Sequence, residues 1–186
     1  MSVLVAYATK HGATRGIAEF IAQKLVAWGQ EAEAKEVRSV GDPSRYQAFV
    51  IGSALYYFSW RPEAIRFVRR NRELLASRPV WLFSSGPIGT KTTDDHGRDV
   101  REGAGPKQLA ELKEAIHPRD HKVFFGALDK SSFGLVERII YALPAGRELL
   151  TVGDFRDWPN VDAWTEGIAR ELALAQASAG APIPAL

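Results

Sequence analysis

One short turn in the sequence has the composition of an anion-binding site. An apolar run, residues 3–8, ends in Thr9-Lys10-His11-Gly12-Ala13-Thr14, and a helical pattern begins directly afterwards. The hydroxyls of Thr9 and Thr14 can donate to phosphate oxygens, and the N–H groups of a first helical turn have no partner within the helix. Gly12 allows a close backbone approach and a positive φ. The pattern predicts a phosphate site at Thr9, Lys10, His11, Gly12, Ala13 and Thr14.

The same turn has a purely structural interpretation, in which Thr14 caps the helix and Gly12 makes a tight turn. Two other nucleotide motifs are excluded. The dinucleotide fingerprint needs three spaced glycines, whereas this turn holds one, and a P-loop needs a Gly-Lys-Ser/Thr ending that is absent.

Two further apolar runs end in segments suited to a flat ring. The run 48–53 leads into an aromatic cluster, and the run 79–84 leads into a turn rich in N–H groups. Because the carboxyl ends of parallel strands share one edge of the sheet, both should lie beside the phosphate turn. Aromatic rings can stack on a heterocycle, although for Tyr56, Tyr57 and Trp60 core packing is an equal alternative. The predicted contacts are Ser53, Ala54, Leu55, Tyr56, Tyr57, Ser84, Ser85, Gly86, Pro87, Ile88 and Gly89.

Apolar runs alternate with helical patterns along the chain, which is typical of a parallel α/β sheet. The expected strands are residues 3–8, 32–37, 48–53, 79–84 and 122–126, and the expected helices follow Thr14, Pro62, Pro106, residue 132 and Pro159. With right-handed crossovers these elements predict a doubly wound sheet. We expect one domain over residues 1–176 and a disordered tail over 177–186.

Composition narrows the function classes. The 186 residues include no cysteine, which excludes disulfides, thiolate nucleophiles and cysteine-bound metal clusters, and Pro118 separates His117 from His121 so that no helical metal pair forms. A net charge of +2 without a basic stripe argues against nucleic acid as a partner. The sequence shows no signal peptide and no membrane-spanning run, so we expect a cytoplasmic protein.

Residues 2–176 resemble the flavodoxin family, and within it most closely the menaquinone-dependent protoporphyrinogen dehydrogenases. The matching segments are Tyr7-Ala8-Thr9 through Thr14, Ile51-Gly52-Ser53-Ala54 with the Tyr56–Tyr57 pair, Phe125-Gly126-Ala127-Leu128, and Gly153-Asp154-Phe155-Arg156-Asp157-Trp158. The resemblance implies strand order 2-1-3-4-5, FMN as cofactor, and transfer of electrons from a porphyrinogen to a quinone. Residues 57–61 depart from the usual pattern of that branch, which leaves the substrate open.

Other functions on this fold are a flavodoxin-type electron carrier, an NAD(P)H:quinone reductase, and a flavin-free regulatory or interaction module. Electron-shuttle flavodoxins are strongly acidic, and the charge of +2 argues against that role. No acid–base residue and no oligomeric state is identified.

Three segments bear on the substrate. The first segment carries five arginines, Arg61, Arg66, Arg69, Arg70 and Arg72. They either meet carboxylates or lipid headgroups, or form a solvated face with an Arg69–Glu73 pair. Residues 128–152 form a helical insertion after strand five with the apolar stripe Leu135, Val136, Ile139, Ile140 and Leu143, for which packing on the sheet is the default. The alternatives are a substrate pocket or peripheral contact with the inner face of a membrane. The polar residues 90–103 are either a mobile lid or a solvated loop.

Overall fold

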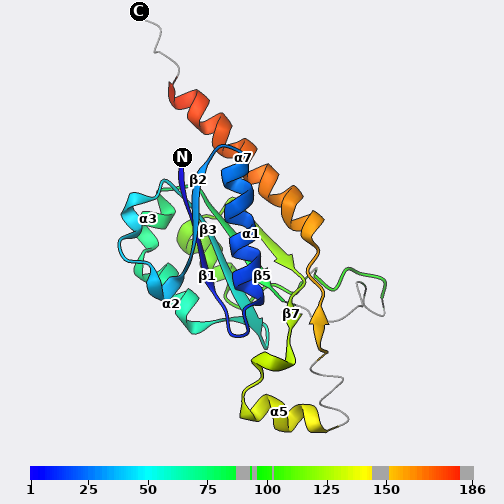
Figure 1. Ribbon diagram of the computed structural model, residues 1–186. Coiled ribbons are helices and arrows are strands. Elements are labelled where there is room, and N and C mark those ends of the chain that lie inside the picture. Colours follow the sequence, from blue (N-terminus) through cyan, green and yellow to red (C-terminus); the bar gives the residue numbers. More distant parts are fainter. Residues whose placement is uncertain (87–92, 94–95, 102, 144–150, 181–186) are drawn as a thin grey trace, which may run out of the picture.

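A parallel β-sheet forms the centre of the molecule. The computed structural model describes residues 1–86, 93, 96–101, 103–143 and 151–180. The parallel strands lie in the order β2-β1-β3-β5-β6 (Figure 1). They are β1 (Ser2–Ala8), β2 (Glu31–Glu36), β3 (Ala48–Tyr56), β5 (Val80–Ser85) and β6 (Asp120–Phe124). Numbered among themselves, these strands confirm the predicted doubly wound order 2-1-3-4-5.

Helices cover both faces of the sheet and enclose two cores (Figure 1). On one face, α1 (Ala13–Ala27) and α7 (Trp158–Gly180) pack on Trp81 and Phe83. On the other, α2 (Pro62–Arg70), α3 (Arg72–Ala76) and α4 (Leu109–Ile116) pack on Leu82 and its neighbours. Successive residues of a strand point to opposite faces, and a strand covered on both sides is apolar throughout. This explains the continuous apolar runs of β1, β3 and β5.

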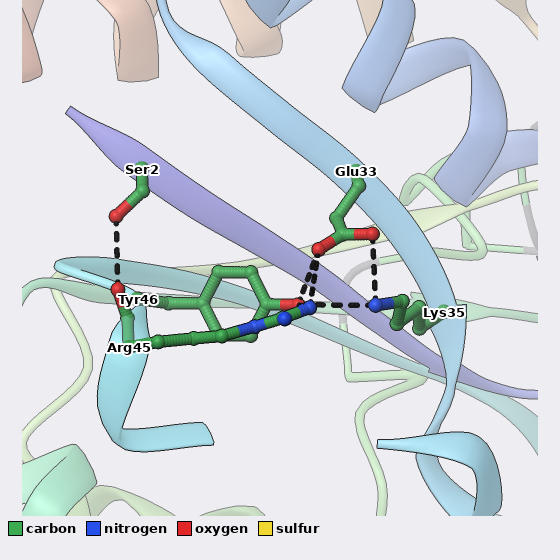
Figure 2. Close-up of polar contacts among 5 residues, drawn as sticks. All are labelled: Ser2, Glu33, Lys35, Arg45 and Tyr46. Carbon is green, nitrogen blue, oxygen red and sulfur yellow. Dashed lines mark hydrogen bonds and ion pairs between the residues drawn. The ribbon is translucent and has the colours of Figure 1, made fainter. Parts of the chain in front are cut away.

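The edge strand β2 carries alternating charged side chains, and a polar cluster joins it to the rest of the sheet (Figure 2). The hydroxyl of the buried Tyr46 donates to Glu33 Oε1, which also binds Nη2 of Arg45 at 2.8 Å. Lys35 Nζ lies 2.9 Å from Glu33 Oε2. The hydrogen bond from Tyr46, followed by that from Lys35, lowers the pKa of Glu33. Because Ser2 at the start of β1 also binds the carbonyl of Arg45, this cluster lies at the amino end of β1.

Several helix boundaries differ from the expected ones. The helix that begins at Pro62 is interrupted at Asn71, whose side-chain amide donates to the carbonyl of Phe67 at 2.8 Å. The helix expected from Pro106 begins at Leu109. The last helix continues to Gly180, so residues 177–180 are helical rather than part of a disordered tail, and residues 181–186 lie outside the described chain.

The predicted helical insertion follows β6, but three residues of its apolar stripe do not pack on the sheet. It comprises β7 (Ala127–Leu128), a 3-10 turn, α5 (Leu135–Ala142) and β8 (Gly153–Asp154), and β7 pairs antiparallel with β8. Figure 1 shows α5 beyond the sheet, at the opposite end from the start of β1 and the end of α7. Leu135, Ile139 and Leu143 are 77%, 60% and 59% exposed. The expectation of sheet packing is therefore wrong for these three residues; residues 144–150 and the side chain of Val136 lie outside the described part.

Among the described residues, no helix combines the length and the apolar composition that crossing a bilayer would require.

Candidate functional site

The turn after β1 is preformed around Gly12. Gly12 is the N-cap of α1 with φ of 88°, a left-handed conformation that favours glycine. Its N–H donates to Thr9 Oγ1 at 3.0 Å, and its carbonyl accepts the N–H of Gly16 at 3.0 Å. These bonds hold the turn so that the N–H groups of the first turn of α1, which have no partner within the helix, point outward from the end of the sheet.

Thr14 is the clearest sign of a ligand at this turn. It is fully buried, and its Oγ1 has no hydrogen-bond partner among the described residues. Thr14 does not cap α1, because Gly12 occupies the N-cap and no side chain bonds there. The structural interpretation of Thr14 is therefore wrong. A buried hydroxyl without a partner costs about 1–3 kcal/mol, which an oxygen-bearing ligand at the helix N-terminus would recover.

The loops at the carboxyl edge of the sheet line a cavity of about 160 Å³. It joins the turns after β1, β3, β5 and β6, as the shared edge of parallel strands requires. Predicted residues that line it are Thr9, Lys10, His11, Ala13, Thr14, Ala54, Leu55, Tyr56, Ser85 and Gly86. Pro87, Ile88 and Gly89 lie outside the described residues.

The prediction of site residues missed Gly126, Ala127 and Leu128, which follow β6 and also line the cavity. The signal was available, because β6 is the neighbour of β5 and its carboxyl end reaches the same edge. Beside the cavity, a wider groove of about 510 Å³ shares His11, Ala13, Ala127 and Leu128 with it and extends to Arg156.

Two predicted contact residues, Ser53 and Ser84, are fully buried and support a neighbouring hairpin. The short strand β4 (Ser59–Trp60) pairs antiparallel with the end of β3. Ser53 Oγ accepts the backbone N–H of Arg61 at 2.9 Å, and Ser84 Oγ accepts the indole N–H of Trp60 at 2.8 Å. Trp60 is itself only 2% exposed, so it belongs to the core and not to a stacking surface.

His121 completes this polar row, with Nε2 at 2.9 Å from Ser84 Oγ. An indole N–H can only donate, so the Ser84 oxygen accepts it and the Ser84 hydrogen is left for an unprotonated Nε2. Burial, followed by the charge of Lys113, lowers the pKa of His121 to about 4, and Asp120 opposes the shift. The row therefore crosses β3, β5 and β6 with a neutral imidazole at its end.

The two tyrosines after β3 are placed differently. Tyr56 lines the cavity, and its ring lies 5.0 Å from Lys10 Nζ and 5.9 Å from the guanidinium carbon of Arg61. The His11 and Tyr56 rings are 6.3 Å apart. Tyr57 is 86% exposed at the tip of the hairpin. The wall of the cavity that Tyr56 forms is therefore flanked by cationic side chains.

Arg156, in the segment 153–158, lies against the first turn of α1. Arg156 binds Asp154 through Nε at 2.8 Å, and its side chain lies over the ring of Trp158 at 4.6 Å. A Cβ at Gly16 would lie 2.4 Å from Arg156 Nη1, so the glycine makes room for the guanidinium. Arg156 is thus a third cationic group at this site, after Lys10 and Arg61, and it lies near the N-terminus of α1.

Two arginines of residues 61–72 form ion pairs with acidic side chains. Arg61 binds the buried Glu63 at 3.0 Å, and this ion pair contributes to the lowered pKa of Glu63. Arg69 forms a two-bond pair with Glu111 of α4, at 2.8 and 3.0 Å, in place of the expected pair with Glu73. In the described part of the polar loop, Arg101 binds Asp99 and holds the pKa of that carboxyl at about 2.

A parallel sheet of this order, with an anion-binding turn before α1 and further loops at the same edge, defines a flavodoxin-like α/β protein. A family model described as a flavodoxin domain matches residues 4–145. The chain belongs to this family, and the membership indicates flavin binding and a redox role.

Individual proteins resemble the chain more distantly. Protoporphyrinogen IX dehydrogenase (quinone) of Escherichia coli strain K12 is 28% identical over 93 residues, which are 49% of this chain and 51% of that protein. The chain thus matches about half the length of its curated relative. Rubredoxin oxygen:oxidoreductase of Desulfovibrio gigas has a TM-score of 0.58 at 14% identity, over 97% of this chain and 37% of that chain. A short-chain flavodoxin associated with a bacterial microcompartment has a TM-score of 0.54 at 11% identity, over 92% and 98%. The two structures share the fold.

The depressed pKa of His121 predicts a pH dependence of stability. Between the ordinary value of 6.5 and about 4, the unfolded ring binds a proton that the folded ring does not. The free energy of unfolding should therefore fall as pH drops through this window, by about 2 kcal/mol from this group. Urea unfolding at pH 7 and pH 4 should show a smaller fall for His121→Gln, which keeps an acceptor for Ser84.

The matched control is His117→Asn, which removes an exposed imidazole and should leave the fall as in the wild type. Equal pH dependence of the wild type and His121→Gln would contradict the neutral, partly buried imidazole.

Proposed function

We propose that the chain binds FMN at the carboxyl edge of its sheet and is an oxidoreductase that passes electrons from a porphyrinogen-type substrate to a quinone. The observation that carries the cofactor assignment is the buried hydroxyl of Thr14, which has no partner among the described residues and lines a cavity at the N-terminus of α1. A phosphate monoester supplies the oxygen atoms that this hydroxyl and the N–H groups of the first turn can bind.

The remaining loops suit the rest of the cofactor. A cavity of about 160 Å³ is smaller than the roughly 300–1,000 Å³ of pockets that enclose a drug-sized ligand, so the ring system would lie partly outside it. Tyr56 and the turn at Ser85 and Gly86 border that opening, and Gly126 follows the adjacent strand. FMN supplies the two-electron redox chemistry, and the protein supplies binding, orientation and electrostatics.

Charge around the opening supports an anionic substrate. Lys10 and Arg61 flank the Tyr56 ring, and Arg156 lies near the N-terminus of α1. These groups suit the carboxylates of a porphyrinogen, the substrate class named for the Escherichia coli relative. They suit an acidic electron carrier less well, since such a carrier gains its partner specificity from negative charge.

An exposed apolar helix supports contact with a membrane, where a lipid-soluble quinone resides. Leu135, Ile139 and Leu143 recur every four residues on α5 and its end, which places them on one side of the helix. Arg138 is an exposed cation on α5 and Lys130 lies in the 3-10 turn before it, and helices with an apolar side and adjacent cations bind the surfaces of anionic bilayers. This contact is peripheral.

Substitution of Thr14 tests the phosphate site. Thr14→Val keeps the shape of the side chain and removes the hydroxyl, so FMN affinity should fall by about 10- to 100-fold because a hydrogen bond to a charged group is lost. Without FMN, the variant should be at least as stable as the wild type, since a buried hydroxyl without a partner is removed. Flavin fluorescence quenching and urea unfolding measure the two effects.

The matched control is Thr165→Val. Thr165 is also fully buried, but its Oγ1 donates to the carbonyl of Val161 at 2.7 Å. This variant should lose stability by about 1 kcal/mol and keep its affinity for FMN. Equal FMN affinity in wild type and Thr14→Val would remove the basis of the cofactor assignment.

A screen of electron donors tests the reaction. FMN-loaded protein, mixed without oxygen with protoporphyrinogen IX, NADH or NADPH, should lose its yellow colour with the porphyrinogen and regain it when menadione is added. Stopped-flow absorbance follows both steps. Reduction by the nicotinamides alone would instead indicate an NAD(P)H:quinone reductase, and a protein that ignores FMN would be a flavin-free module.

Vesicle binding tests the role of α5. With phosphatidylglycerol-containing vesicles, Leu135→Gln combined with Ile139→Gln should lower the partition coefficient by at least about 100-fold, since burial of each such side chain is worth about 1.5–3 kcal/mol. Leu174→Gln, which changes an exposed leucine on α7, is the control and should bind as the wild type does. Sedimentation with vesicles gives the bound fraction, and equal binding of all three proteins would exclude α5 as the contact.

A further inference from the structure

Two arginines project from the outer side of α2 into solvent. Arg66 and Arg70 lie four residues apart, which places them on one side of the helix, and both are exposed. Neither side chain forms an ion pair or a hydrogen bond with any residue that the structure describes. The neighbouring Arg69, Arg72 and Glu73 instead line a groove between the α2–α3 pair and α4. The outer side of α2 is therefore a separate surface with its own charge.

The charge around Arg66 and Arg70 is predominantly positive. Glu63 lies on the same side of α2, three and seven residues before them, but it is buried. Its carboxylate is held between Arg61 at 3.0 Å and Arg38 at 3.7 Å. Arg38 comes from the 3-10 turn Val37–Ser39, which packs on α2, and its side chain is 63% exposed. The exposed part of this side of α2 thus carries cations, in a chain whose net charge is only +2.

The stability of the helix does not explain this arrangement. Like charges four residues apart repel each other and destabilise a helix. The helix dipole favours Arg70, which lies in the last turn of α2, but Arg66 lies in the middle of the helix and gains little from it. A partner with negative charge would remove the repulsion between the two guanidinium groups.

The shape of this surface favours an extended anionic partner. Arg38, Arg66 and Arg70 are spread over the outside of the fold, so a small anion could contact few of them at once. A bilayer with anionic headgroups presents many phosphate groups in one plane, and arginines clustered on an amphipathic helix are typical of binding to such lipids. A guanidinium can bind one phosphate through two N–H groups.

The start of α2 also lies beside the candidate cofactor site. Its N-cap residue, Arg61, lies 5.9 Å from the ring of Tyr56, which lines the cavity. The hairpin that precedes α2 pairs with the end of β3, so the helix begins at the end of the sheet beyond which α5 lies (Figure 1). A surface that contacts α2 is therefore close to the opening of the cavity.

We infer that Arg38, Arg66 and Arg70 form a second membrane contact, which binds anionic headgroups and brings the opening of the cavity beside the bilayer; this inference rests on the proposed function. The apolar stripe of α5 supplies the hydrophobic part of the contact, and the arginines on α2 and the adjacent turn supply the electrostatic part. Two separate contacts fix the orientation of the protein on the bilayer, which one helix alone does not.

Vesicle composition separates the two contacts. Arg66→Gln combined with Arg70→Gln should lower the partition coefficient for phosphatidylglycerol-containing vesicles about 30-fold, since each arginine near an anionic surface contributes about 1 kcal/mol. On vesicles of phosphatidylcholine alone, which have no net charge, the variant should bind as the wild type does. Sedimentation gives both coefficients. Glutamine and arginine have similar helix propensities, so the melting temperature should not fall.

Two further variants serve as controls. Arg66→Lys combined with Arg70→Lys keeps both charges and should retain most of the binding to phosphatidylglycerol. Arg119→Gln combined with Arg170→Gln removes the same charge elsewhere, at residues paired with Glu171 and Glu166 of α7, and should leave the coefficient within about twofold of the wild type. The Kd for FMN should be unchanged in every variant.

The inference is overturned where the Arg66→Gln, Arg70→Gln variant binds phosphatidylglycerol vesicles as the wild type does. It is equally overturned where the Arg119→Gln, Arg170→Gln variant loses as much binding, because net charge alone would then explain the effect. Displacement of the wild type by soluble glycerol phosphate at constant ionic strength would also overturn it, since a single small anion would then suffice. Failure of the wild type to bind either kind of vesicle would instead remove the membrane contact of the proposed function as well, so the two failures are distinct.

Discussion

The rest of the site depends on the hydroxyl of Thr14, which is buried at the start of α1 and has no partner among the residues that the structure describes. A folded protein rarely leaves such a group unpaired, because its desolvation is not recovered. Gly12 shapes the turn that presents the neighbouring N–H groups, and Thr9 locks that turn through its own hydroxyl. A single anionic ligand group would satisfy all of these donors together, which supports the proposal of a phosphate-bearing cofactor at this edge of the sheet.

The second organising feature is the row of polar side chains beneath the hairpin. Ser53, Ser84 and His121 come from three adjacent strands and lie on the face of the sheet that α2 and α4 cover. Ser53 accepts the backbone N–H of Arg61, and Ser84 binds both Trp60 and His121. The hydroxyls of Ser53 and Ser84 are hydrogen-bonded and the imidazole is neutral. These polar groups can therefore lie next to the apolar interior. The row anchors the loop that carries Tyr56 to the rigid sheet.

Charge and exposed apolar surface gather at the same end of the molecule. Lys10 and Arg61 lie against Tyr56, and Arg156 lies against the first turn of α1. Tyr57, Phe58 and the apolar stripe of α5 are exposed at the carboxyl end of the sheet, whereas the start of β1 and the end of α7 lie at the opposite end (Figure 1). This polarity distinguishes the chain from a uniformly acidic carrier and favours a substrate with both anionic and apolar parts.

The sequence by itself determined the parallel sheet and the position of the turn after its first strand, whereas the strand order came from the family resemblance. Continuous apolar runs identify β1, β3 and β5 as strands buried on both faces, and a glycine flanked by threonines at a strand–helix junction is a local pattern. Thr9, Lys10, His11, Ala13 and Thr14 line the cavity as predicted, and they could be found because the pattern lies within six consecutive positions.

Only the tertiary structure decided which side chains reach the cavity. Ser53 and Ser84 follow the right strands but point to the face beneath the hairpin, and their partners Arg61, Trp60 and His121 are 8, 24 and 37 residues away. Likewise the stripe of α5 has the period of a core helix, and its exposure follows from where β7 and β8 place it. Periodicity shows that a helix or strand has two sides, whereas the contacts that distinguish those sides come from distant parts of the chain.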